Sequence, residues 1–210
     1  MNFEEKYKPE KFSDIVGQDE TVESLKSMKE NGELSHMLFF GSWGCGKTSM
    51  ALVIKNEFDI ELIKFRAHDF MRNGIMDIII TIAKHVPQKT YKAVLLDDFE
   101  KLSISQQELL RGTMDTYSKT CKFIVTCNNT ASIDPGILSR CRIYYFQAIQ
   151  EPDAIKRLKF ICKEEGLKIS DQDLNRILNN AKRINSEGKV IGFDLRQCIK
   201  YLEDLCNRRR

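Results

Sequence analysis

A run of eight residues, Gly41 to Thr48, has the spacing G-x-x-x-x-G-K-T that is typical of a phosphate-binding loop. An apolar segment, residues 37–40, precedes the loop, and a helix-compatible apolar segment, residues 50–54, follows it. Glycines let backbone N–H groups turn toward phosphate oxygens, and the N-terminus of the following helix adds partial positive charge. We expect Lys47 to contact the β- and γ-phosphates of a nucleoside triphosphate and the Thr48 hydroxyl to ligate Mg²⁺. The alternative, a glycine-rich turn with a chance Lys-Thr pair, does not explain the strand-loop-helix context. The residues expected to bind the nucleotide here are Gly44, Cys45, Gly46, Lys47, Thr48 and Ser49.

Acidic and amide side chains follow two other apolar segments. Asp97 and Asp98 come directly after residues 93–96. We expect Asp97 to hold Mg²⁺, directly or through water, and Asp98 to orient or deprotonate an attacking water. The alternative is that the pair only ends a buried strand before a turn. Asn128 follows residues 122–126, and its amide can hydrogen-bond both a γ-phosphate and the water, although Asn128 also suits a simple turn.

These residues need a sheet to bring them together, and the order of the predicted elements supplies one. Strands and helices alternate, which indicates an α/β fold with a parallel, doubly wound sheet and ligands beyond the carboxyl ends of its strands. We expect the strand before Asn128 to lie between the strand before the loop and the strand before Asp97. The predicted strands are residues 37–40, 60–65, 93–96, 122–126 and 142–146, and the predicted helices besides the one after the loop are 19–30, 75–82 and 105–117. Residues 1–20 are predicted to form an extended arm because Pro9 disfavours helix at the residue before it. Ser105 to Glu108 is predicted to be a helix-capping box.

From residue 151 onward the pattern is helical only. Three amphipathic segments are predicted to pack as a small bundle, with Ser170 and Asp173 capping the second. We therefore predict a nucleotide-binding α/β domain over residues 1–148 and a helical lid over residues 149–210.

The composition limits the class of protein. Hydrophobic content of 42% and charged content of 30% are ordinary for a globular protein, and no apolar run approaches the about 18 residues of a membrane span. The acidic N-terminus is unlike a signal peptide, so we expect no membrane partner. Seven cysteines without a C-x-x-C pair argue against a disulfide framework or a zinc site and for a reducing, intracellular compartment. His36, His68 and His85 are too scattered to bind a metal, and a net charge of +3 is too small to identify a nucleic-acid binder.

Further motifs occur in order along nearly all 210 residues. They are Tyr7-Lys8-Pro9, Leu96-Asp97-Asp98, Met114-Asp115-Thr116-Tyr117-Ser118, Cys127-Asn128, Ser139-Arg140-Cys141 and Asp194-Leu195-Arg196. With the phosphate-binding loop they resemble the small ATPase subunits of DNA-polymerase clamp loaders, namely the replication factor C small subunits and their T4-like bacteriophage counterparts, in the AAA+ superfamily. Ser139-Arg140-Cys141 is the most family-specific of these motifs, whereas the loop alone indicates only an NTPase.

The resemblance implies an activity, cofactors and partners. It implies a five-stranded AAA+ domain with a three-helix lid that uses ATP and Mg²⁺, within a hetero-oligomeric, five-subunit ring, to open a sliding clamp and load it on primer–template DNA. It also favours the cytoplasm of a prokaryotic or phage-infected cell over a nucleus. Two alternatives stay open: an ATP-binding scaffold subunit with little hydrolysis, and another AAA+ DNA machine such as a helicase loader or branch-migration motor.

The resemblance also assigns roles to single residues. Arg140 matches the arginine finger that reaches the ATP of a neighbouring subunit, although without its motif it would pass for a surface arginine. Arg196 matches the lid residue that senses the γ-phosphate. The segment around the adenine is matched by Glu4, Glu5, Lys6, Tyr7 and Val16. Residues near helix starts that face DNA are matched by Arg72, Asn73, Ser105 and Gln106, for which solvated caps are the default interpretation.

Three features depart from the family pattern. Asp98 stands where the family has Glu, so its reach to water is one methylene shorter and hydrolysis is expected to be slower. Ser42-Trp43 and Cys45 replace the usual Pro-Pro and Thr of the loop but keep its glycines. The family has a third, helical collar domain, whereas these 210 residues end after the expected lid. A truncated chain, a split gene and assembly through other contacts are all compatible with that length.

Overall fold

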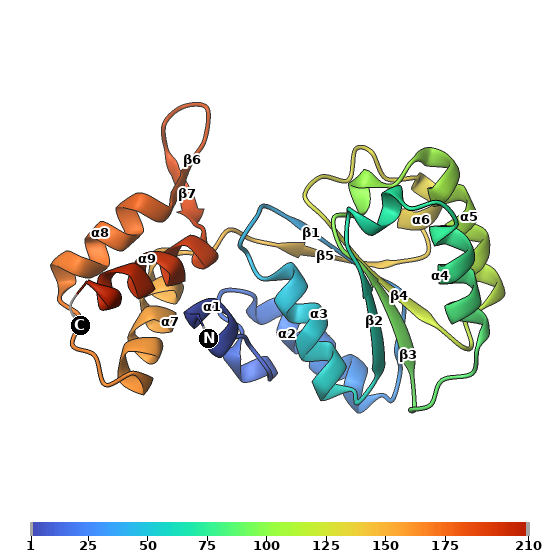
Figure 1. Ribbon diagram of the computed structural model, residues 1–210, viewed down its shortest axis with the longest axis horizontal. Helices are drawn as coiled ribbons and strands as arrows, with labels where there is room; N and C mark the ends of the chain where they lie inside the picture. Colours follow the sequence, from blue (N-terminus) through green and yellow to red (C-terminus); the bar gives the residue numbers. More distant parts are fainter. Residues whose placement is uncertain (1, 209–210) are drawn as a thin grey trace.

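The structure, a computed structural model, describes residues 2–208 and has a five-stranded parallel sheet at the centre of its larger part (Figure 1). The strands are β1 (Met37–Gly41), β2 (Glu61–Phe65), β3 (Lys92–Leu96), β4 (Lys122–Cys127) and β5 (Arg142–Phe146). Their order is β2-β3-β4-β1-β5, and all four pairings are parallel. The predicted sheet is therefore confirmed. Strand β4, which precedes Asn128, lies between β1 and β3 as predicted.

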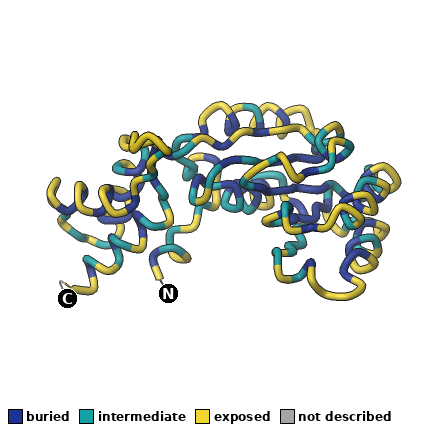
Figure 2. The backbone as a smooth tube through the Cα atoms, turned by 90° about the horizontal axis from the view of Figure 1, so that it is seen from above, coloured by how far each residue is buried: buried dark blue, intermediate teal, exposed yellow. Residues whose placement is uncertain are grey.

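Helices cover both faces of this sheet. One face packs against α2 (Asp19–Glu30) and α3 (Lys47–Glu57). The other packs against α4 (Ile75–Lys84), α5 (Ile104–Thr116) and the short α6 (Pro135–Leu138). Because side chains alternate along a strand, Phe39 of β1 enters the first core and Leu38 the second. The three central strands, β1, β3 and β4, are buried along most of their length, whereas β2 and β5 at the edges are not, and Figure 2 shows buried backbone through the middle of the sheet. A sheet covered on both faces leaves its strand ends as the place where a ligand can bind.

The second part of the molecule contains three helices with a core of their own. They are α7 (Glu151–Glu164), α8 (Asp171–Ala181) and α9 (Leu195–Asn207). The prediction of helices alone was wrong here, because a hairpin of β6 (Lys182–Ile184) and β7 (Val190–Phe193) connects α8 to α9. The turn between these strands forms because Asn185 Oδ1 accepts N–H groups from Glu187 and Lys189. Figure 1 shows the hairpin projecting from the helices.

The N-terminal segment joins the two parts, and the prediction of an extended arm was wrong for much of it. It contains α1 (Phe3–Lys6) and a 3-10 turn, η1 (Phe12–Asp14). The side chain of Asn2 accepts the Glu5 N–H at 2.9 Å and so caps α1, which ends before Pro9. Phe3 is buried in the core of the lid helices, whereas Phe12 is buried in the core under the sheet.

The capping box of helix α5 (Ile104–Thr116) lies two residues earlier in the sequence than predicted. Ser103, not Ser105, is the N-cap: its Oγ accepts the Gln106 N–H at 3.3 Å, and Gln106 Oε1 accepts the Ser103 N–H at 2.9 Å. The box predicted for α8 is confirmed, with Ser170 accepting the Asp173 N–H. Two more 3-10 turns, η2 (Asp69–Met71) and η3 (Phe99–Lys101), follow β2 and β3. Across residues 2–208, no helix combines the length and the apolar character needed to cross a membrane.

Candidate functional site

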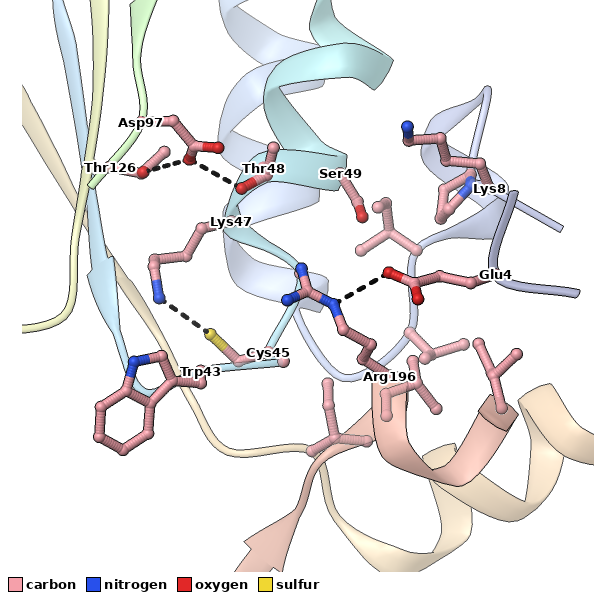
Figure 3. A pocket seen from close by; sticks show the side chains of 18 of the residues that line it. Glu4, Lys8, Trp43, Cys45, Lys47, Thr48, Ser49, Asp97, Thr126 and Arg196 are labelled. Atoms are coloured by element: carbon pink, nitrogen blue, oxygen red, sulfur yellow. Dashed lines mark hydrogen bonds and ion pairs between the residues drawn. The ribbon is translucent and has the colours of Figure 1, made fainter. Parts of the chain in front are cut away.

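A cavity of about 450 Å³ lies at the carboxyl ends of the central strands, between the phosphate-binding loop, the N-terminal segment and the start of α9 (Figure 3). Its volume is within the range of small-molecule sites. Most of the residues expected to bind nucleotide and metal line it. These are Glu4, Tyr7, Val16, Gly44, Cys45, Gly46, Lys47, Thr48, Ser49, Asp97, Asp98, Asn128 and Arg196.

Lys47 is almost fully buried at the floor of this cavity. Its ammonium donates to the Gly41 carbonyl at 2.6 Å, to the Ser42 carbonyl at 2.9 Å and to Asn128 Oδ1 at 3.0 Å. A buried charge needs such acceptors. Gly46, with φ of 101°, is the N-cap of α3 and has no side chain to occupy the N–H groups of the first turn. The loop therefore presents a cation and helix N–H groups to the same space, which suits phosphate.

The predicted metal ligands, Thr48 and Asp97, meet directly. Asp97 Oδ1 accepts the Thr48 hydroxyl at 2.8 Å and the Thr126 hydroxyl at 2.6 Å, and Oδ2 pairs with Lys64 Nζ at 2.6 Å. Burial opposes ionisation of Asp97, but these hydrogen bonds outweigh it and hold the pKa of Asp97 below its ordinary value. A carboxylate beside a hydroxyl, next to a phosphate-binding loop, is a donor set that fits Mg²⁺.

Asp98 and Asn128 line the same cavity. Asp98 has a left-handed backbone, with φ of 60° and ψ of 48°, and its N–H donates to Thr126 Oγ1. Partial burial and the nearby charges of Asp97 and Glu100 raise the pKa of Asp98. Asn128 Nδ2 donates to Glu100 Oε1 at 2.7 Å while its Oδ1 faces Lys47. The orientation of the Asn128 amide is therefore set from both ends.

The lid contacts the loop through the first residues of α9. Asp194 caps α9 by accepting the Gln197 N–H, and it pairs with Arg183 of the hairpin at 3.0 Å. A Cβ at Gly44, where φ is 62°, would lie 2.1 Å from Asp194 Oδ1, so only glycine allows this approach. Two residues on, Arg196 Nε pairs with Glu4 Oε1 at 3.1 Å across the mouth of the cavity (Figure 3).

Two residues predicted near the adenine do not line the cavity. Glu5 is not among its lining residues, and Lys6 turns toward α7, where its Nζ pairs with Glu165 at 2.6 Å. Arg157 of α7 is buried beside them and donates to the Tyr7 carbonyl. The sequence prediction missed Arg157, as it missed Thr126 and Lys64, which also line the cavity. A single charge between Ile63 and Phe65 in an apolar strand was the available signal for Lys64.

Arg140 lies outside the cavity of its own chain. Its guanidinium donates to both oxygens of Asp115, at 2.6 and 2.7 Å, and to the Gly136 carbonyl at 2.8 Å. It follows α6, which lies beside α5 on the side of the sheet away from the lid (Figure 1).

The residues predicted to face DNA form a separate surface. Arg72, Asn73 and Ser105 are exposed, and Gln106 donates to the Phe70 carbonyl at 3.0 Å, which ties the η2 segment to the start of α5. None of the four lines the cavity.

Comparison with known proteins agrees with this geometry. Residues 37–148 match the family model described as ATPase family associated with various cellular activities (AAA). The chain is 34% identical over 211 residues to a replication factor C small subunit of Thermoplasma volcanium, covering 95% of this chain and 62% of that protein. For the same-named protein of Archaeoglobus fulgidus the identity is 32%, covering 96% and 64%. The chain thus spans less than two thirds of the length of these relatives.

The fold also matches solved structures of low sequence identity. A variant of Thermotoga maritima RuvB superposes with a TM-score of 0.78 at 17% identity, covering 96% of this chain and 66% of that one. Thermotoga maritima RuvB described as a Holliday junction branch migration motor superposes with a TM-score of 0.70 at 16% identity, covering 95% and 73%. The matched family model covers more than half of the chain and includes the loop, Asp97, Asp98 and Asn128. The chain therefore belongs to the AAA family of ATPases.

Proposed function

We propose that this chain is an ATPase subunit of a sliding-clamp loader, which uses ATP to open the clamp and place it on primer–template DNA. One observation carries the proposal. The cavity combines a phosphate-binding loop, a metal-type carboxylate and a lid, whereas Arg140 is presented on another surface of the same chain. A site that needs a cation from a neighbour couples hydrolysis to assembly. The similarity to replication factor C small subunits supports the clamp as the object of that coupling.

In this proposal each residue of the cavity has a distinct task. Lys47 and the N–H groups of the loop bind the phosphates, and Thr48 and Asp97 hold Mg²⁺, which when bound neutralises phosphate charge. Asp98 orients or deprotonates water, and Asn128 fixes that water relative to the phosphate. Arg196 exchanges its partner Glu4 for the nucleotide and so reports occupancy to the lid.

The proposal includes the assembly and the surroundings of the chain. A neighbour's Arg140 completes the site. Inside a five-subunit ring, the residues that face DNA are Arg72, Asn73, Ser105 and Gln106. The boundary between the nucleotide-binding domain and the lid is proposed at residues 148 and 149, between β5 and α7. All seven cysteines are free thiols, which suits a reducing, intracellular location.

The test measures ATP turnover by the assembly containing this chain, with a sliding clamp, with primed DNA, with both and with neither. We expect turnover to rise at least about tenfold only when both are present. Replacing Lys47 by Ala in the same assembly should remove the stimulated turnover. Equal turnover in all four conditions would contradict coupling to clamp loading.

A second candidate is a scaffold subunit that binds ATP with little hydrolysis. Two properties of Asp98 favour this candidate: its side chain is short, and its pKa is raised, which makes it a less complete carboxylate base. In that case the assembly would retain bound ATP through many rounds of clamp loading, and labelled ATP recovered from the chain would be intact. Recovery of ADP after loading would exclude the scaffold.

A further inference from the structure

The two oxygens of the Asp97 carboxylate have different partners. Oδ1 accepts the hydroxyls of Thr48 and Thr126, both of which belong to the loop-and-strand framework. Oδ2 accepts neither hydroxyl, so it is the oxygen that can contact a cation. In this structure its partner is the ammonium of Lys64, at 2.6 Å. The Lys64 side chain is 23% exposed and the Asp97 side chain 14%. The ion pair is therefore mostly shielded from water. A pair in such a position is screened less by solvent and salt than an exposed one.

The backbone keeps Lys64 in reach of Asp97. Lys64 lies on β2, directly paired with β3, and the Asp97 N–H donates to the carbonyl of Phe65 at 2.9 Å. The ends of the two strands are thus joined. Because Lys64 lines the cavity, a change of rotamer can move its ammonium away from the carboxylate without moving β2.

We infer that Lys64 is a built-in counter-ion of the metal-binding carboxylate, which shields Asp97 when no metal is bound and competes with Mg²⁺ for it. The inference rests on the proposed binding of ATP with Mg²⁺. Without metal, the ammonium cancels a negative charge that would repel the nucleotide phosphates. With metal, the ammonium and the dication repel each other beside one carboxylate, so Mg²⁺ binding requires Lys64 to move. Both effects reduce the dependence of nucleotide binding on Mg²⁺.

The measured quantity is the ratio of ADP affinity in saturating Mg²⁺ to ADP affinity in EDTA, from calorimetric titration of the 210-residue chain. Lys64→Met should raise this ratio by about tenfold, because ADP binds more weakly in EDTA and Mg²⁺ gains more from Asp97. Lys64→Gln removes the same charge with a polar side chain and should act alike, which guards against misfolding of either variant. Lys64→Arg keeps the charge and should leave the ratio near that of the wild type.

A matched control removes a lysine from a similar ion pair elsewhere. Lys29 Nζ pairs with Glu57 Oε2 at 2.7 Å, and neither residue lines the cavity. Lys29→Met should leave the ratio unchanged. An unchanged or lower ratio in Lys64→Met, or an equal rise in Lys29→Met, would overturn the inference. Wild-type chain that binds no ADP would contradict the proposed function as well, whereas normal binding with an unaltered Lys64→Met ratio contradicts the inference alone.

Discussion

At the scale of single residues, the backbone of Asp98 explains why a short side chain occupies the position next to Asp97, the proposed metal ligand. Its φ of 60° places it in the left-handed region, which Asp and Asn tolerate better than Glu. The conformation is held by the N–H bond to Thr126 Oγ1. The shorter reach of Asp98 to water is thus linked to the turn that begins η3.

Asp98→Asn tests whether this side chain acts as the base. Asn keeps the size and the left-handed preference but cannot take a proton. We expect ATP turnover to fall by at least about 10²-fold, with nucleotide affinity nearly unchanged. The melting temperature should stay the same or rise, because the raised pKa of Asp98 shows that its charged form is disfavoured in the folded chain. Turnover within a factor of about two of the wild type would exclude Asp98 as the base.

Residues of the site differ in how far the sequence could identify them. Lys47, Thr48 and Asp97 were predictable because a local motif or a strand end determines their position. Lys64 and Glu100 were not, because their partners depend on strand order and on the turn after β3, both of which are tertiary features. Glu5 and Lys6 matched a family segment, but the direction in which a side chain leaves a one-turn helix does not follow from such a match.

At the scale of elements, the start of β1 depends on a buried histidine. His36 Nδ1 accepts the Phe123 N–H of β4 at 3.0 Å, and its carbonyl accepts the Arg142 N–H of β5 at 2.8 Å. Burial, together with the charge of Lys122, lowers the pKa of His36 to about 4. His36, which directly precedes β1, is therefore bonded to β4 through its neutral imidazole and to β5 through its backbone carbonyl.

This depressed pKa predicts an acid sensitivity. An unfolded chain takes up the proton near pH 6.5 while the folded chain resists it, so stability is present above about pH 6.5 and is lost as the pH falls toward 4. Between pH 7.5 and 5 the wild type should lose roughly 2 kcal/mol more than His36→Asn, whose Oδ1 can still accept the Phe123 N–H. Urea denaturation at both pH values measures this. Equal losses in the two proteins would show that His36 does not titrate as described.

Helix α9 has a cap that serves two purposes. Asp194 accepts the Gln197 N–H, and its carboxylate lies against Gly44 of the loop. Asp194→Ala should lower the free energy of unfolding by about 1 kcal/mol and also weaken nucleotide binding, because Arg196 loses its fixed position. Ser170→Ala removes the cap of α8, which is remote from the cavity, and should cost similar stability without changing nucleotide affinity. Equal affinities in the two variants, measured by titration with ADP, would contradict a role for the α9 cap in the site.

The elements themselves were largely predictable, with exceptions that have local causes. Periodicity identified the five strands and the long helices, since each buries one continuous apolar surface. The sequence did not predict the hairpin of β6 and β7. Its strands have only three and four residues, several of them exposed, so their alternation of apolar and polar side chains is too short to distinguish from a loop. The hairpin nevertheless contacts the start of α9, because Arg183 on β6 pairs with Asp194, the N-cap of that helix.

At the scale of the whole molecule, the cavity and Arg140 lie on different surfaces of one chain. The N-terminal segment contacts both parts of the molecule, because Phe3 is buried in the lid core and Phe12 in the sheet core. The side chain of Arg140 is oriented by its two hydrogen bonds to Asp115, at the other end of the α/β part. The sequence identifies both the phosphate-binding loop and the Ser139-Arg140-Cys141 motif. It does not show that they lie on different surfaces, because that depends on the fold.

That separation predicts complementation between inactive variants. Arg140→Ala lacks the finger and Asp98→Asn lacks the base, so assemblies of either variant alone should be inactive. In assemblies formed from equal amounts of both, about a quarter of the joints pair an intact cavity with an intact finger, and turnover should recover to about a quarter of the wild type. Mixing Asp98→Asn with Lys47→Ala puts both lesions in the cavity, so no joint is complete and no recovery is expected. Absence of recovery in the first mixture, with assembly confirmed by sedimentation, would mean that Arg140 does not act on the nucleotide of a neighbouring chain.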